Sequence, residues 1–161
     1  MLYIAAMVLL VGFVTIVHAA GGERELNVDA MVEALRQVEN WDGHSRGAAG
    51  ERGPWQITPA VWNQFSDQPF SYAESRAPWC RSETRRVARE YVLWIHRRLS
   101  DAKLPAGPFT VALVWTSGWN AYFYHSPHKP TRRKKDYAER ARNLYKEIEK
   151  VAQSGVPVPT Q

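Results

Sequence analysis

The sequence predicts a mainly α-helical single domain of about five helices, with little or no sheet. Apolar residues recur at helical spacing in several segments, whereas the period-two alternation typical of half-buried strands is nearly absent. The chain has 161 residues, of which 45% are hydrophobic and 23% charged, and this is the composition of one globular domain. Disorder of the whole chain is therefore excluded.

The first helix is expected to begin after an N-cap at Asn27 and to end near Val38 or Glu39. Its apolar positions are Val28, Met31, Val32, Leu35 and Val38. A polar, glycine-rich stretch follows at 43–53. Thr58 is then expected to cap a short second helix, which has Pro59 in its first turn. Residues 66–81 contain prolines and several polar residues, and they predict a loop.

Three more helices are expected in the second half of the chain. The longest begins near Ser82 and carries an apolar stripe from Val87 to Leu99. Residues 109–115 are apolar nearly all round, which predicts a short helix buried inside the domain. The last helix is expected over roughly 136–152. Its buried positions would be Tyr137, Ala141, Leu144, Ile148 and Val151.

The N-terminal segment predicts export. Residues 1–17 contain no charged side chain, are rich in aliphatic residues and are followed by small residues at 19 and 20. The run is short for a membrane span and has the length of a signal peptide at 1–19. Because no Lys or Arg precedes it, an uncleaved anchor in the inner membrane is the alternative. We expect an exported domain over 20–153, periplasmic or secreted, and a flexible tail over 154–161.

Glu39 is a carboxylate at an inward-facing position of the first expected helix, where the other residues are apolar. On a helix it shares a face with Val32 and Leu35, which is the face that packs inward, and it lies at the C-terminal end, where the helix dipole is negative. Desolvation and the dipole both raise the pKa of a carboxyl group. A carboxyl that stays protonated near neutral pH is suited to general acid catalysis. The alternative is that the helix ends one residue earlier and Glu39 points into water.

The residues that follow Glu39 carry a resemblance to a known family. They form a glycine-bounded turn and a short helix in the pattern G-x-x-G-[LP]-x-Q-[IVL]-x-P-x-x-W. This pattern resembles the lysozyme-like superfamily and, within it, the bacterial lytic transglycosylases of the soluble type. The chain supplies Glu39, Gly50, Gly53, Gln56, Pro59 and Trp62 in that order. The resemblance implies a lysozyme-like fold for the single domain.

Two later segments extend the resemblance, with departures from the family pattern. Residues 112–118 are similar to an A-x-A-Y-N-A-G turn, but Trp115 and Thr116 replace the usual Tyr-Asn pair. Tyr137 matches a family tyrosine that opens the last helix and lines the groove near the acid. Asn40 stands where the family commonly has Ser, and Pro54-Trp55 stands where it has Leu-Met. These departures concern the sugar subsites more than the chemistry.

The resemblance implies that the chain cleaves the β-1,4 bond between N-acetylmuramic acid and N-acetylglucosamine in peptidoglycan. Glu39 would act first as general acid and then as base, while the 6-hydroxyl of the muramic acid attacks its own anomeric carbon. The product has a 1,6-anhydromuramoyl end, and the reaction needs neither a second carboxylate nor a cofactor. Substrate contacts are implied for Trp55, Gln56, Trp115, Thr116 and Tyr137. For Gln56 the alternative is a turn residue that bonds local backbone groups.

Other functions stay open. Asp42 and Glu51 are the nearby candidates for a second carboxylate, and either one facing Glu39 would allow a hydrolytic, lysozyme-type muramidase. A non-catalytic peptidoglycan-binding module of the same fold is a further alternative, and so is an envelope-assembly component.

The remaining chemistry-bearing residues form no recognisable metal site. Cys80 is the only cysteine, which excludes an intrachain disulfide and a cysteine-clustered zinc site. His125 and His128 have ligand-like spacing but no acidic or cysteine partners near them, so we expect no metal. Tryptophans expected in loops could stack on sugars or belong to the core, and these are Trp41, Trp55, Trp79 and Trp119. The helical placement of Trp62, Trp94 and Trp115 favours the core.

The charge balance favours anionic partners. Lys and Arg number 21 against 16 Asp and Glu, a net charge of +5. The run 132–135, Arg-Arg-Lys-Lys, is either a solvated face or a surface that attracts an anionic wall polymer or lipid phosphate. The export signal argues against nucleic acid. We therefore expect peptidoglycan glycan strands as the partner, with peripheral envelope association through the basic surface.

Overall fold

The computed structural model of the chain describes residues 25–39, 47–125 and 129–154, and these residues are mainly α-helical, as predicted. The elements in chain order are α1 (Val28–Glu39), α2 (Pro59–Phe65), the 3₁₀ helix η1 (Phe70–Glu74), α3 (Pro78–Asp101), α4 (Pro108–Ser117), the π-helical segment η2 (Ala121–His125) and α5 (Arg132–Gln153). The described residues contain no strand; Arg52 and Ile57 form an isolated antiparallel bridge. The predicted leader, 1–19, and tail residues 155–161 lie outside them. Within the described ranges, no helix combines the length and apolar character that crossing a membrane requires.

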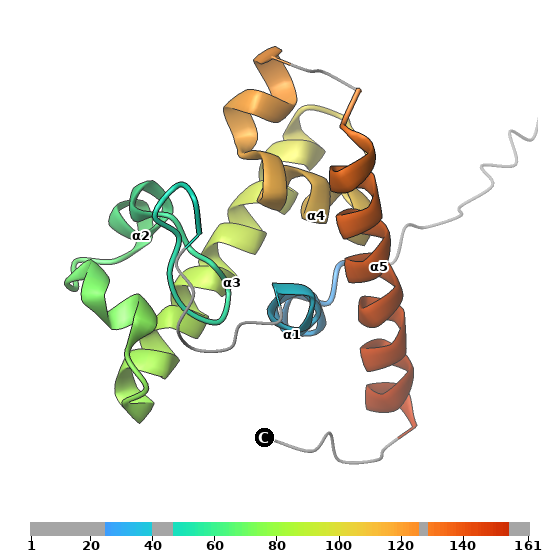
Figure 1. Cartoon of the computed structure of the whole chain (residues 1–161). Helices are drawn as coiled ribbons and strands as arrows, with labels where there is room; N and C mark the ends of the chain where they lie inside the picture. Colours follow the sequence, from blue (N-terminus) through green and yellow to red (C-terminus); the bar gives the residue numbers. More distant parts are fainter. Residues whose placement is uncertain (1–24, 40–46, 126–128, 155–161) are drawn as a thin grey trace, which may run out of the picture.

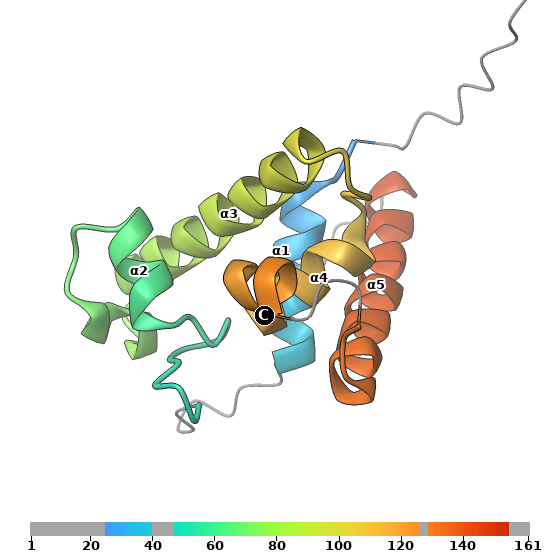
Figure 2. The ribbon, with the colours of Figure 1, turned by 90° about the horizontal axis from the view of Figure 1, so that it is seen from above.

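Helix α1 lies at the centre of the domain, between α3 and α5 (Figures 1 and 2). Its inward face is fully buried at Met31, Val32 and Leu35, as the helical spacing predicts. Helix α4 packs against α5 and α3, and its residues from Thr110 to Val114 are all buried. The prediction of a short helix inside the domain is therefore confirmed. Burial of these apolar side chains is the main source of stability for such a core.

The caps account for where the helices begin. The Asn27 side chain accepts a hydrogen bond from the Ala30 amide at 3.1 Å, and the Thr58 hydroxyl accepts one from the Val61 amide at 3.3 Å. Both caps were predicted from the sequence. Thr131 caps α5 in the same way through the Lys134 amide, so α5 begins at Arg132 and not near 136.

The segment predicted to be a loop at 66–81 is partly helical. Residues 70–74 form η1, and α3 begins at Pro78, before the predicted start at Ser82. The Thr84 hydroxyl donates to the carbonyl of Cys80 at 2.7 Å and lies 3.3 Å from the carbonyl of Tyr72, which joins the first turns of α3 to η1. Prolines at 69 and 78 precede or open these helices without breaking them.

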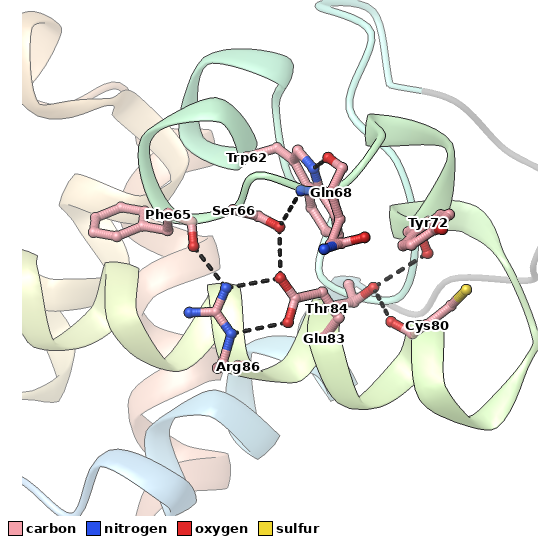
Figure 3. A network of polar contacts seen from close by, with 9 residues as sticks. All are labelled: Trp62, Phe65, Ser66, Gln68, Tyr72, Cys80, Glu83, Thr84 and Arg86. Atoms are coloured by element: carbon pink, nitrogen blue, oxygen red, sulfur yellow. Dashed lines mark hydrogen bonds and ion pairs between the residues drawn. The ribbon is translucent and has the colours of Figure 1, made fainter.

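A polar network fastens α2 to α3 (Figure 3). The carboxylate of Glu83 accepts a hydrogen bond from the Ser66 hydroxyl at 2.5 Å and two from the Arg86 guanidinium at 2.7 and 2.9 Å. Arg86 also donates to the carbonyl of Phe65, at the end of α2, at 2.7 Å. The hydrogen bonds from Arg86 are the main cause that lowers the pKa of Glu83 to about 2, with Ser66 acting in the same direction.

This network predicts a pH-dependent contribution to stability. Because the pKa of Glu83 in the folded chain lies below its usual value of 4.5, its stabilisation is present above that value and is lost as the pH falls toward 2. Glu83→Gln is therefore expected to lower the free energy of unfolding by about 1 kcal/mol at pH 7, with little effect near pH 2.

Urea unfolding at several pH values measures this difference. Glu90→Gln is the matched control, because Glu90 lies on the same helix and, among the described residues, its one ion pair is a 4.0 Å contact with Arg89. An equal loss of stability in both variants, or a Glu83→Gln loss that does not change with pH, would contradict the assignment.

Candidate active site

A tight turn at 52–57 forms one side of the site. The backbones of Arg52 and Ile57 exchange two hydrogen bonds of 2.9 Å, and the Gln56 amide donates to the carbonyl of Gly53 at 2.9 Å. Gly53 has a φ of +74°, and a Cβ at this position would overlap the carbonyl oxygen of Ala73. Glycine is therefore required here both for the backbone conformation and for the close approach of the turn to η1.

Trp55 fixes the turn to α1. Its indole nitrogen donates to the carbonyl of Val32 at 2.9 Å, and the side chain is 6% exposed within the core. Trp55 does not line the cavity described below. The substrate contact implied for Trp55 is therefore not among those that the cavity brings together; the indole satisfies a backbone carbonyl of α1 and fills the space between the turn and the helix.

A large cavity of about 1240 Å³ opens beside the C-terminal end of α1. Its walls come from the turn region, α2, one face of α3, the end of α4 and the beginning of α5. Of the residues predicted to contact substrate, it brings together Gln56, Trp115, Thr116 and Tyr137 around Glu39. The five residues are spread over a long stretch of sequence, and the packing of the turn, α1, α4 and α5 places them along one cavity.

Glu39 is the last residue of α1 and is half-buried in the cavity lining. Its Oε1 accepts a hydrogen bond from the hydroxyl of Tyr137 at 2.6 Å, so the carboxyl group does not point freely into water. Burial raises the pKa of Glu39, and the negative charge of Glu51 acts in the same direction. Hydrogen bonds from Tyr137 and Trp115 and the charge of Arg140 oppose this shift without cancelling it.

Tyr137 is a permanent hydrogen-bond donor to this carboxyl group. Burial raises the pKa of its phenol well above 10, and the charge and hydrogen bond of Glu39 add to the shift. Helix α5 begins at Arg132, and Tyr137 lies in its second turn. It therefore keeps its proton at every pH at which Glu39 titrates.

Gln56 has a structural role and a place in the cavity at once. Its side-chain amide donates to the carbonyl of Gly53 at 3.0 Å, and its backbone has a φ of +46°, which is uncommon for a residue with a side chain. The local turn bond that was considered as an alternative is thus present, and the side chain also lines the cavity.

Aromatic side chains that sequence reasoning did not assign to the site form one of its walls. Tyr91 and Trp94 from α3 lie beside Trp115 and Trp119, with ring centroids 5.2 to 5.8 Å apart along the series. Arg98 lies over Trp94, at 5.0 Å from the ring centroid. A spacing of three and four residues on a helix, as in Tyr91, Trp94 and Arg98, is the signal that could have placed them on one face.

The other tryptophans expected in loops differ from one another, and the structure places Trp79 in the first turn of α3 and not in a loop. Trp119 lines the cavity and stacks on Phe123, with centroids 4.3 Å apart. Trp79 is 59% exposed, packs edge-on against Tyr72 and does not line the cavity. Trp41 and Asp42 lie outside the described residues.

Glu51 lines the same cavity as Glu39. One of its carboxylate oxygens accepts a hydrogen bond from the Ala49 amide at 2.8 Å. Basic residues also line the cavity, and these are Arg98, Arg133, Lys134 and Arg140. Among the residues that the structure describes, no three His, Cys, Asp or Glu side chains gather as a metal site would require.

Comparisons with models of known protein families, with curated proteins and with solved structures give no match for this chain. The chemistry must therefore be read from the geometry. A half-buried carboxyl group with a raised pKa, held by a phenol at the side of a large cavity, can give a proton to a bound substrate and take one back.

The two neighbours of Glu39 are expected to move its pKa in opposite directions. Tyr137→Phe removes a hydrogen bond that favours the ionised form and should raise the pKa of Glu39, whereas Glu51→Gln removes a repelling charge and should lower it. The carboxyl ¹³C shift of Glu39, followed by NMR as a function of pH, measures both changes. Shifts of the same sign in the two variants would show that the environment of Glu39 is described wrongly.

Proposed function

We propose that the chain is an exported lytic transglycosylase of the lysozyme-like superfamily, which cleaves peptidoglycan glycan strands through Glu39. The observation that carries the proposal is the carboxyl group of Glu39, half-buried beside a large cavity and bonded to Tyr137 at 2.6 Å. The order of Glu39, the glycine-bounded turn and Tyr137 along the chain is the resemblance that suggests this family, and Glu39 and Tyr137 are in contact in the structure.

In the proposed reaction, protonated Glu39 gives its proton to the glycosidic oxygen as the bond to the anomeric carbon breaks. The 6-hydroxyl of the same muramic acid then attacks that carbon, and the Glu39 carboxylate takes the hydroxyl proton. The products are a free sugar hydroxyl and a 1,6-anhydromuramoyl end, so water is not consumed and Glu39 returns to its protonated form. Because its pKa is raised, Glu39 is protonated to a greater extent at a given pH than an exposed glutamate, which favours the first step.

The remaining lining suits a sugar chain. Indole and phenol rings offer flat apolar surfaces for sugar rings, while Thr116, Asn120 and Gln64 offer polar groups for hydroxyls and acetamides. The intramolecular nucleophile is part of the substrate, so positioning and proton transfer are the main demands on the protein.

Digestion of purified murein tests the function directly. The wild-type chain should release muropeptides with anhydro ends, identified by mass spectrometry, and Glu39→Gln should reduce the rate by about 10³-fold because it removes the general acid. Glu33→Gln is the matched control, since Glu33 lies on the same helix, pairs with Arg36 and does not line the cavity.

The digest also distinguishes the rival functions. Binding of murein without release of any soluble product by the wild-type chain would favour a non-catalytic binding module. Equal activity of the wild type and Glu39→Gln would remove Glu39 from the mechanism.

A hydrolytic muramidase is the second candidate, and the position of Glu51 favours it. Glu51 shares the cavity with Glu39 and its charge raises the pKa of Glu39, so it is near enough to be considered as the second carboxylate. A base at this position could activate a water molecule, which would give reducing ends.

The type of product in Glu51→Gln separates the two reactions. For a transglycosylase, both the wild type and Glu51→Gln should give anhydro ends. As the pH is raised, the activity of Glu51→Gln should begin to fall at a lower pH than the activity of the wild type, because the pKa of Glu39 is lower in the variant. Reducing ends from the wild type that decrease relative to anhydro ends in Glu51→Gln would establish the hydrolase.

A further inference from the structure

The four consecutive cations that open α5 are divided by the helix into two pairs. Arg133 and Lys134 line the cavity, whereas Arg132 and Lys135 do not. The division follows from helical spacing, since 133 and 134 lie four and three residues before Tyr137, which contacts Glu39. Arg140, three residues after Tyr137, lines the cavity on the same face.

The cations of the cavity differ from those of the outer surface in their partners. Arg132 is 95% exposed and pairs with Asp136 at 3.9 Å. In the described part of the chain, no carboxylate lies within ion-pair distance of Arg133, Lys134 or Arg98. Lys134 is also half-buried, and it reaches a small side pocket that is lined in addition by Lys129 and Thr131. Unpaired positive charges gathered in a cavity attract an anionic ligand.

A neutral glycan chain offers these cations no anion. Both N-acetylated sugars are uncharged when the lactyl group of the muramic acid is joined to its peptide through an amide bond. The carboxylates of such a strand belong to the peptide. We infer that the cavity recognises glycan strands by the carboxylates of their stem peptides, which Arg133 and Lys134 bind. This inference rests on the proposed function and specifies the substrate within it.

An ion contact between a peptide carboxylate and these cations should be lost when the charge on either partner is removed. Charge-assisted hydrogen bonds from Arg and Lys to carboxylates are stronger than neutral ones. Because the cavity is open to solvent, the contribution should also weaken as salt is added.

Equilibrium binding in a Glu39→Gln background, which prevents turnover, tests the inference. The two ligands are a murein tetrasaccharide carrying its stem peptides and the same compound with the peptide carboxylates converted to carboxamides. The parent protein should bind the acid form about tenfold more tightly than the amide form at low salt. Adding Arg133→Gln and Lys134→Gln should abolish that preference and leave binding of the amide form unchanged.

The matched control is the pair Arg132→Gln and Lys135→Gln, which removes the same charge from the same helix outside the cavity. This control should keep the preference for the acid form within about twofold. Three results would each overturn the inference. They are equal affinity of the parent for both ligands, equal effects of the two charge-removing pairs, and a loss of affinity for the amide form in the Arg133→Gln, Lys134→Gln variant. Failure of every protein to bind either ligand would instead overturn the proposed function, and the inference with it.

Discussion

The hydrogen bond between Tyr137 and Glu39 is the contact on which the site depends. It joins the last residue of α1 to α5, across 98 residues of sequence, at 2.6 Å. The packing of α1 against α5 buries the carboxyl group, and this burial is the largest cause of its raised pKa. Tyr137 partly opposes that shift, since its hydrogen bond favours the ionised form. The carboxyl group is therefore held in place by a partner that limits, without abolishing, its tendency to remain protonated.

On the other side of the cavity, a few specific contacts attach the turn at 52–57 to the core. Trp55 ties the turn to the carbonyl of Val32, and Gly53 allows the turn to approach Ala73. Arg52 reinforces this attachment by pairing with Glu74 at 3.2 Å. The cavity thus lies between two parts that are each fastened to the core, the turn on one side and α5 on the other. Such rigid support is what a site that positions a substrate and transfers a proton requires.

The helices and the half-buried position of Glu39 could be predicted from the sequence because their signals are local. The spacing around Leu35, the Asn27 and Thr58 caps, and the apolar run after Pro108 define elements without reference to the rest of the chain. The resemblance implies a substrate contact for Trp55, whereas the burial of its indole follows from a tertiary contact with Val32 that no local signal in the sequence indicates. The start of α3 was missed because prolines and polar residues are equally typical of loops and of first helical turns. Arg133, Lys134 and Arg140 could have been placed by their spacing from Tyr137, had that helix face been followed.

The proposed mechanism depends on a carboxyl group whose ionisation the folded chain disfavours, and the pH dependence of stability tests this without any substrate. Because the pKa of Glu39 is raised in the folded chain, the wild type should lose stability as the pH rises from its unfolded value near 4.5 through the folded value. A glutamine at this position does not titrate. The difference in unfolding free energy between Glu39→Gln and the wild type, measured from pH 4 to 8, should therefore increasingly favour the variant as the pH rises and then level off. A difference that stays constant over this range would mean that Glu39 titrates as it does in the unfolded chain, and the central claim would be wrong.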